Sequence, residues 1–110
     1  MQKGFIMISR NWRGVARREE ATNYVRHLEH DTFPLLSGID GFVSASILRR
    51  DTTAGVEFLI VTSWRSMEAI RKFAGEAVDV AVVPPTVQAM MIEYDKEVDH
   101  YEIVSQYERR

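Results

Sequence analysis

Residues 41–75, GFVSASILRRDTTAGVEFLIVTSWRSMEAIRKFAG, contain the pattern that decides the fold. Two runs rich in β-branched and aromatic residues, 42–49 and 56–64, flank a short turn-forming segment, which predicts an antiparallel hairpin. Ser66 then has the position and chemistry of a helix N-cap, and it precedes a helix predicted over residues 67–74. The chain is therefore expected to pass from a β-hairpin directly into a helix.

The segments on either side of this stretch add further strands and helices. A strand is predicted over residues 4–9 and a polar turn over 10–14. Apolar residues at three- and four-residue spacing between positions 21 and 35 predict an amphipathic helix. Proline at a first helical turn suits a short helix over residues 85–90. The last strand is predicted over residues 98–107, after a solvated turn at 93–97.

The predicted order is strand, helix, strand, strand, helix, helix, strand. This order is typical of an α+β, ferredoxin-like split βαβ fold, with a four-stranded antiparallel sheet and helices on one face. Apolar residues occupy both faces of the second strand, with Phe42 and Leu48 expected on one side and Val43, Ala45 and Ile47 on the other. Because the second face also needs a cover, we expect one domain over residues 1–110 that forms a homodimer by sheet-to-sheet packing.

The composition restricts the partners and surroundings of the chain. Its 14 basic and 16 acidic side chains give a formal net charge of −2, without the basic excess of nucleic-acid-binding proteins. The absence of cysteine excludes disulfides and Cys-ligated metal centres, and it favours a reducing cytoplasm. All apolar runs are far shorter than the roughly twenty residues of a membrane span, so no membrane partner is expected.

Three parts of the chain resemble the antibiotic biosynthesis monooxygenase family of dimeric α+β barrels. They are GFVSASILRR (41–50), FLIVTSWRSMEAIRKFAG (58–75) with Trp64 at the corner between strand and helix, and VDHYEIV (98–104). The resemblance spans residues 3–107. It implies a small-molecule oxygenase, because some members convert phenols to quinones with O2 and no cofactor, while others open haem or degrade signalling quinols.

The resemblance also allows the members' site patterns to be compared with this chain. Haem-degrading relatives use an Asn late in the first strand, a Trp at the corner and an iron-ligating His after the second main helix. Trp64 matches and Asn11 lies slightly out of register, but residues 73–83 contain no histidine. Quinone-forming relatives carry an Asn four residues before the corner Trp, where this chain has Ile60.

The function implied is a cofactor-independent monooxygenase that uses O2 as co-substrate on a small aromatic or quinol-like compound. Such a reaction needs a base that deprotonates the substrate and a dry pocket in which the anion can reduce O2. A haem-degrading oxygenase is the less favoured oxygenase alternative, because the iron-ligating histidine is missing. A non-catalytic dimeric barrel that binds a small hydrophobic ligand is the other alternative. A polar group facing the cavity between helices and sheet would favour the enzyme.

Two histidines are the candidate catalytic bases. His27 lies three residues after Tyr24 and one turn before Asp31, a spacing at which the carboxylate can orient the imidazole. His100 shares a strand face with Glu102, and no third ligand can be placed beside this pair, so no metal site is predicted. A helix-surface role for His27 and a structural role for His100 near the dimer seam are the alternatives.

Four residues are candidates for substrate binding: Trp64, Tyr24, Asn11 and Trp12. Trp64 at the pocket edge is expected to stack on a planar substrate, with packing in the core as the alternative. Asn11 and Trp12 follow the first predicted strand in a loop that would cap the same cavity. The alternative is a surface loop in which Arg10 and Arg13 make cation–π contacts with Trp12.

Overall fold

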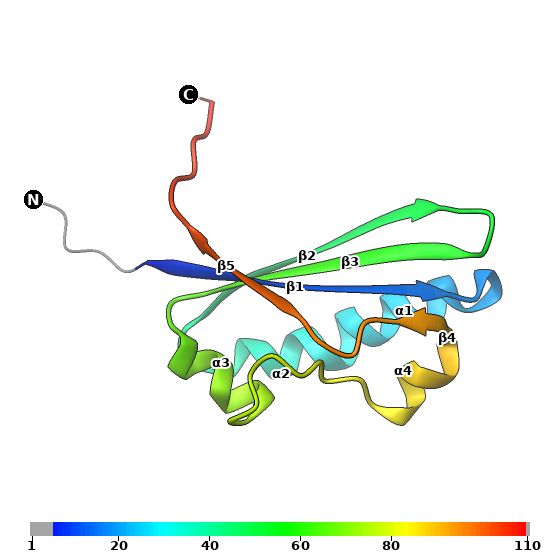
Figure 1. Ribbon diagram of the computed structural model, residues 1–110, viewed down its shortest axis with the longest axis horizontal. Helices are drawn as coiled ribbons and strands as arrows, with labels where there is room; N and C mark the ends of the chain where they lie inside the picture. The colour runs from blue at the N-terminus through cyan, green and yellow to red at the C-terminus, as the bar shows by residue number, and fades with distance from the viewer. Residues whose placement is uncertain (1–5, 110) are drawn as a thin grey trace, which may run out of the picture.

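An antiparallel sheet forms one layer of the structure, and the helices lie on one face of it (Figure 1). The computed structural model describes residues 6–109. The strands are β1 (Met7–Ala16), β2 (Phe42–Asp51), β3 (Val56–Trp64), β4 (Met91–Tyr94) and β5 (Asp99–Ile103). The helical segments are a 3₁₀ turn (Arg18–Glu20), α1 (Ala21–His27), a π-helical turn (Leu28–Thr32), α2 (Phe33–Ser37), α3 (Met67–Ala74) and α4 (Pro85–Met90). The predicted α+β class, with helices on one face, is confirmed.

The strand order is β2-β3-β1-β4, and β5 also pairs with β1. The prediction of four strands is therefore wrong by one, because two short strands share the last position. β5 pairs with the first half of β1 and β4 with its end. The final strand is shorter than predicted. The predicted turn at residues 93–97 is also wrong at Glu93 and Tyr94, which belong to β4.

The first strand differs most from its prediction. β1 pairs with β3 without interruption from Ile8 opposite Trp64 to Ala16 opposite Val56, so residues 10–14 form strand rather than a polar turn. The start of the predicted strand, at residues 4 and 5, lies outside the described residues. The polar composition of 10–14 predicted a turn, but pairing on both sides satisfies the backbone of a central strand whatever its side chains.

A proline reshapes the first helical region. Pro34 has no N–H to donate to the carbonyl four residues earlier, so the α-helical hydrogen-bond pattern is interrupted there. The residue before it, Phe33, donates its N–H to the oxygen of Leu28, five residues back. This wider π-helical turn shifts the apolar stripe by one position. Leu36 is buried as a result, whereas Leu35, which the sequence pattern placed on the buried face, is 63% exposed.

Side chains from the helices and from the helix-facing side of the sheet form two buried clusters. One contains Tyr24, Leu28 and Phe58, and the other surrounds Trp64 beside α3. A β-bulge at the start of β2 turns Phe42 toward Trp64, with ring centroids 5.3 Å apart. Phe42 and Leu48 therefore do not share a face as predicted, because the bulge breaks the alternation between them.

The helix after the hairpin has its predicted bounds, Met67–Ala74. The hydroxyl of Ser66 accepts a hydrogen bond from the backbone N–H of Ala69 at 3.1 Å, which confirms the predicted N-cap. Gly75 follows with a φ of 85°, a conformation that favours glycine. None of the helices in residues 6–109 is long and apolar enough to cross a membrane.

Candidate functional site

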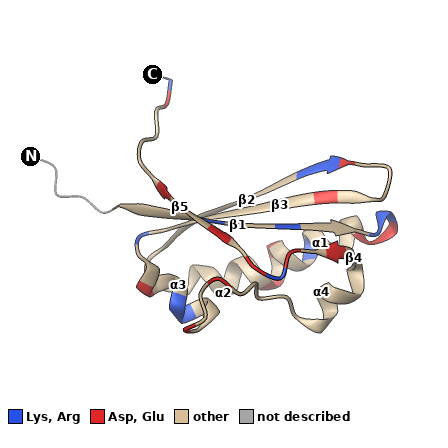
Figure 2. Ribbon diagram, in the orientation of Figure 1, with Lys and Arg blue, Asp and Glu red and all other residues tan. Residues whose placement is uncertain are grey.

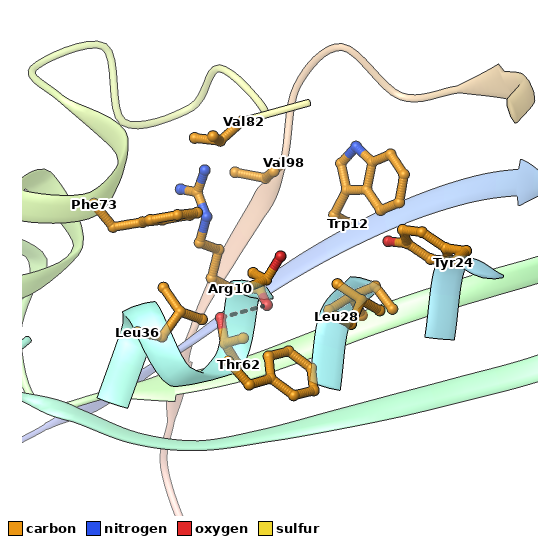
Figure 3. Close-up of a pocket in the computed structure, with 12 residues that line it drawn as sticks. Arg10, Trp12, Tyr24, Leu28, Leu36, Thr62, Phe73, Val82 and Val98 are labelled. Atoms are coloured by element: carbon orange, nitrogen blue, oxygen red, sulfur yellow. Dashed lines mark hydrogen bonds between the residues drawn. The ribbon is translucent and has the colours of Figure 1, made fainter. Parts of the chain in front are cut away.

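A narrow cavity lies between the sheet and the helical region from α1 to α2 (Figure 3). Its volume is about 80 Å³, and a smaller space of about 50 Å³ adjoins it, sharing Trp12, Tyr24 and Leu28 as walls. Residues 75–84, here called the covering segment, contribute Val82 to the wall. Most of the lining is apolar, but several side chains carry polar groups: Arg10, Trp12, Tyr24, Thr32 and Thr62 in the cavity and His27 in the adjoining space.

Tyr24 directs its hydroxyl toward the interior of the cavity, between Trp12 and Leu28 (Figure 3). The residue is 2% exposed, and its ring packs edge-on against Phe58 with centroids 4.9 Å apart. Burial raises the pKa of Tyr24 well above its usual value, so the phenol stays protonated. No hydrogen bond within residues 6–109 uses this hydroxyl, which leaves its proton available to a ligand.

Arg10 extends from β1 into one end of the cavity and is only 5% exposed. Its Nη1 donates to the carbonyl oxygen of Val78 at 2.6 Å, and its Nη2 donates to that of Val80 at 3.2 Å. The guanidinium also lies over the ring of Phe73, 5.8 Å from the centroid. Arg10 thus ties β1 to the covering segment and places a buried positive charge at the cavity.

His100 stands behind Arg10 rather than in the cavity wall. The two residues face each other across β5 and β1, and Nη1 of Arg10 lies 3.0 Å from Nε2 of His100. The other ring nitrogen, Nδ1, lies 3.2 Å from Oδ1 of Asp79. Because arginine can only donate, Nε2 is the acceptor and Nδ1 carries the proton that Asp79 accepts. His100 therefore orients Arg10 and makes no direct contact with the cavity space.

Two other predicted residues line the cavity. Trp12 borders both spaces, and its indole N–H donates to the carbonyl oxygen of Asp95 at 2.8 Å. His27 borders the smaller space, and its Nδ1 lies 3.2 Å from Oδ2 of Asp31. The predicted orientation of His27 by Asp31 is thus present in the structure, which leaves Nε2 as the nitrogen that can accept a proton.

Trp64 and Asn11 do not line the cavity. Trp64 is fully buried beneath it, where its N–H donates to Oγ1 of Thr62 at 2.8 Å and its ring stacks on Phe73. Asn11 lies on the opposite face of β1 from Arg10 and Trp12, and its side chain donates to Oγ of Ser9 at 3.1 Å. The structure places Trp64 in the core and Asn11 outside the site, so neither is kept as a substrate-binding candidate.

Comparison with known protein families identifies the group to which this chain is related. The family model described as antibiotic biosynthesis monooxygenase matches residues 7–78, which is more than half of the chain. The chain belongs to this family. The resemblance drawn from the sequence is therefore confirmed. No curated protein matches the sequence.

Solved structures of similar fold include two oxygenases and a heme-degrading protein. SnoaB, a cofactor-independent oxygenase from Streptomyces nogalater, has a TM-score of 0.63 at 12% identity, covering 91% of this chain and 95% of that one. A Streptomyces coelicolor monooxygenase in complex with nanaomycin D scores 0.62 at 14%, covering 96% and 94%. A heme-degrading protein from Mycobacterium tuberculosis scores 0.59 at 14%, covering 94% and 99%. At these identities the similarity shows that this chain shares the fold of those proteins.

Haem, the compound that one of these proteins is named for degrading, does not fit the cavity of this family member. The volume of about 80 Å³ is far below the roughly 300–1,000 Å³ typical of cofactor sites. The nitrogen donors are also misplaced, since residues 73–83 contain no histidine and Nε2 of His100 already faces Arg10. Within residues 6–109, no three His, Asp or Glu side chains lie close enough together to hold a metal ion.

Sequence reasoning missed the role of Arg10, which it placed in an exposed loop. The available signal was strand parity, because Arg10 follows Ile6 and Ile8 in alternation and so shares their face. Thr62 was also missed. It lies two residues before Trp64 on the same face of β3 and lines the cavity where Trp64 was expected to do so.

His100 should make this family member less stable in acid. Burial, followed by the positive charge of Arg10, lowers the pKa of His100, while Asp79 on the covering segment and Asp99 on β5 oppose the shift. Below about pH 6.5, the ordinary histidine value, the unfolded chain then binds a proton that the folded protein resists, so the free energy of unfolding falls. We expect His100→Gln to make this fall shallower in denaturant titrations across a pH series.

The matched control is His30→Gln, which changes an exposed histidine on the first helical region. This variant should retain the pH profile of the wild-type protein. A His100→Gln profile that also coincides with the wild type would contradict the contact between Arg10 and His100 as the origin of the effect.

Proposed function

We propose that this family member is a cofactor-independent monooxygenase that oxidises a small phenol or quinol-like compound with O2. The observation that carries the proposal is a mainly apolar cavity that a protonated Tyr24 hydroxyl faces, with the His27 imidazole bordering the adjoining space. A dry site strengthens each electrostatic interaction with a substrate anion and protects reduced oxygen species from water. We place the reaction in the cytoplasm, in line with a sequence that contains no cysteine.

His27 acts as the base in this proposal. Its Nδ1–H donates to Asp31, so Nε2 can take the proton of the substrate hydroxyl. Tyr24 donates a hydrogen bond to the resulting phenolate oxygen, because its own raised pKa keeps the proton on the tyrosine. The two residues lie three positions apart on one helical face and border the same space. They therefore supply a proton acceptor and a proton donor at one side of the ligand.

The reaction balances without a cofactor. The phenolate passes one electron to O2, and the resulting superoxide combines with the substrate radical at an unsubstituted ring carbon, ortho or para to the oxygen. The peroxide formed then loses water to give a quinone. One oxygen atom of O2 enters the product and the other leaves in water, which takes one hydrogen from the ring carbon and one from the original hydroxyl through the base.

Oxygen uptake by the purified full chain tests the proposal. Phenols with one, two and three rings are supplied in turn with isotopically labelled O2, and the products are analysed by mass spectrometry. We expect protein-dependent uptake and one labelled oxygen atom per product molecule. Binding of these phenols in the cavity without oxygen uptake by any of them would overturn the enzyme proposal in favour of a non-catalytic ligand-binding barrel.

We also propose that the protein is a homodimer in which two sheets pack face to face. The face of the sheet opposite the helices carries Leu48, Leu59 and Tyr101, which are 46%, 38% and 62% exposed. Leu48 and Leu59 pair directly across β2 and β3. Beside them, Glu57 on β3 bonds to both Arg13 on β1 and Arg50 on β2. Figure 2 shows acidic and basic positions on these three neighbouring strands. Such an apolar face with paired charges suits a self-complementary interface.

Sedimentation equilibrium tests this interface. The wild-type chain should sediment as a dimer at micromolar concentration, since obligate homodimers commonly bury more than about 2,000 Å². Leu59→Glu would bury an unpaired charge and should raise the dissociation constant by about 30-fold or more. Leu35→Glu, which changes an exposed residue on the helical layer, is the control and should remain dimeric. A stable wild-type monomer of 12.7 kDa would overturn the proposal.

A further inference from the structure

We propose that the cavity selects a one-ring phenol that carries a second, anionic group, and that Arg10 is the charge partner of that group. The proposal rests on the proposed function, because it takes the cavity as the place where the substrate is oxidised. It adds the size and the charge of the substrate, and each follows from a separate feature of the site.

The size follows from the volume of the cavity. The cavity and the adjoining space measure about 80 Å³ and 50 Å³. An apolar cavity of about 150 Å³ is known to take up a single benzene ring. The walls are large side chains packed from two directions, with Trp12 on the sheet and Leu28 on the helical region. One aromatic ring therefore fits between these walls, whereas a second fused ring would extend beyond the space that they border.

The charge follows from the surroundings of Arg10. Within residues 6–109, no carboxylate oxygen lies within 4.0 Å of its guanidinium nitrogens. Its hydrogen-bond partners are instead two backbone carbonyls and the imidazole of His100, which carry no negative charge, and Asp79 attracts the guanidinium only from behind that imidazole. A buried charge without a direct counter-ion is costly. An anionic ligand that enters the cavity would remove part of this cost.

The arrangement of the guanidinium leaves a donor for such a ligand. The hydrogen bonds of Arg10 to other described residues use Nη1 and Nη2, and none uses Nε. The contacts with Val78, Val80, His100 and Phe73 hold the group in one place, so little side-chain freedom is lost when an anion binds. His100 is a positioning residue in this scheme, because it acts on the ligand through Arg10.

The two ends of the cavity then define the orientation of the ligand. Arg10 and Phe73 lie at one end, and Trp12 and Tyr24 lie at the other (Figure 3). The anionic group is held by Arg10, while the phenol oxygen at the far side of the ring meets Tyr24 and His27. This placement favours a hydroxyl and an acidic group on opposite positions of one ring, with the carbons ortho to the hydroxyl open to oxygen.

Calorimetric binding of matched probes to the full chain tests the inference. Para-hydroxybenzoate and its neutral analogue para-hydroxybenzamide have nearly the same shape, and a hydroxynaphthoate carries the same charge on two rings. We expect the benzoate to bind about tenfold or more tightly than the amide, as a charge-assisted hydrogen bond implies, and more tightly than the naphthoate. In Arg10→Met the preference for the anion should disappear, while Arg26→Met, on the exposed side of α1, should keep it.

A second measurement does not depend on whether Arg10→Met folds. In the wild-type protein, the NMR signal of the Arg10 Nε–H should shift when para-hydroxybenzoate is added and stay in place with the amide. Equal affinities for acid and amide, tighter binding of the naphthoate, or an unchanged Nε–H signal would each overturn the inference.

Oxygen uptake measured on the same samples separates this inference from the proposed function. Uptake confined to neutral or two- and three-ring phenols would overturn the inference and leave the oxygenase proposal in place. Selective binding of the one-ring anion, without uptake by any phenol in the panel, would support the ligand class and overturn the oxygenase.

Discussion

Replacing Trp64 with alanine should lower the free energy of unfolding by about 3–5 kcal/mol. The side chain is completely buried, packs against Phe42 and Phe73, and donates its indole N–H to Thr62. Alanine would leave a cavity in the second cluster and remove the donor to Thr62. Urea unfolding followed by circular dichroism measures the loss, which is a large share of the roughly 5–15 kcal/mol of a typical domain.

A pair of tryptophan variants separates core packing from ligand binding. Trp64→Phe keeps an aromatic ring in the cluster and should lose about 1–3 kcal/mol of stability without weakening ligand affinity. Trp12→Phe changes a ring that lines the cavity, so its main effect should be on the ligand. If Trp64→Phe melted like the wild type but bound ligand poorly, Trp64 would belong to the site after all.

The elements that the sequence predicted best have strong local signals. The hairpin strand at Val56–Trp64 and the helix at Met67–Ala74 have their predicted bounds. Both are defined by neighbouring residues, since the alternation of the strand and the Ser66 cap need no distant partner. The family resemblance rested on the same region, which explains why fold class and family were predicted together.

The errors arose where distant pairing overrides local preference. Polar residues at 10–14 favour a turn by themselves, but β3 and β5 pair with this part of the chain and make it a central strand. The contact of Arg10 with His100 joins residues 90 positions apart. No local pattern contains that contact. Strand parity can place Arg10 on the face of Ile6 and Ile8, but it cannot predict that the guanidinium is buried against His100.

The candidate site was predicted in part for the same reason. Tyr24 and His27 were found because helical spacing places them on one face, and both border the cavity. Trp64 was expected at the pocket edge because it ends a strand. Its residue parity puts it on the helix-facing side, but α3 and Phe73 cover it and leave Thr62 to form the wall. Thr62 and Trp64 share one face of β3, and the packing of α3, not the strand pattern, decides that Trp64 is the one that is covered.

His27→Gln should lower the turnover number of the proposed oxygenase by about 10²–10⁴-fold, the usual contribution of a general base. Glutamine has a similar reach and can still form a hydrogen bond near Asp31, but it cannot take the proton of the substrate. Because the phenol still meets Tyr24 and Trp12, the affinity for the unreacted substrate should change little. The expected signature is a reduced kcat at a nearly constant KM, measured as oxygen uptake.

His30→Gln provides the matched control for this loss, because His30 is exposed on the next turn and does not border the cavity. Asp31→Asn removes the charged acceptor from Nδ1 of His27 and should cause a smaller fall in kcat than His27→Gln, since the imidazole itself remains.

If His27→Gln consumed oxygen at the wild-type rate, the base would have to be sought elsewhere. His100 would then be a poor substitute, because both of its ring nitrogens already face Arg10 and Asp79 and neither borders the substrate space. Deprotonation would have to occur in solution, and an oxygenase that accepts only preformed phenolate should show a turnover that rises with pH up to the pKa of the substrate itself.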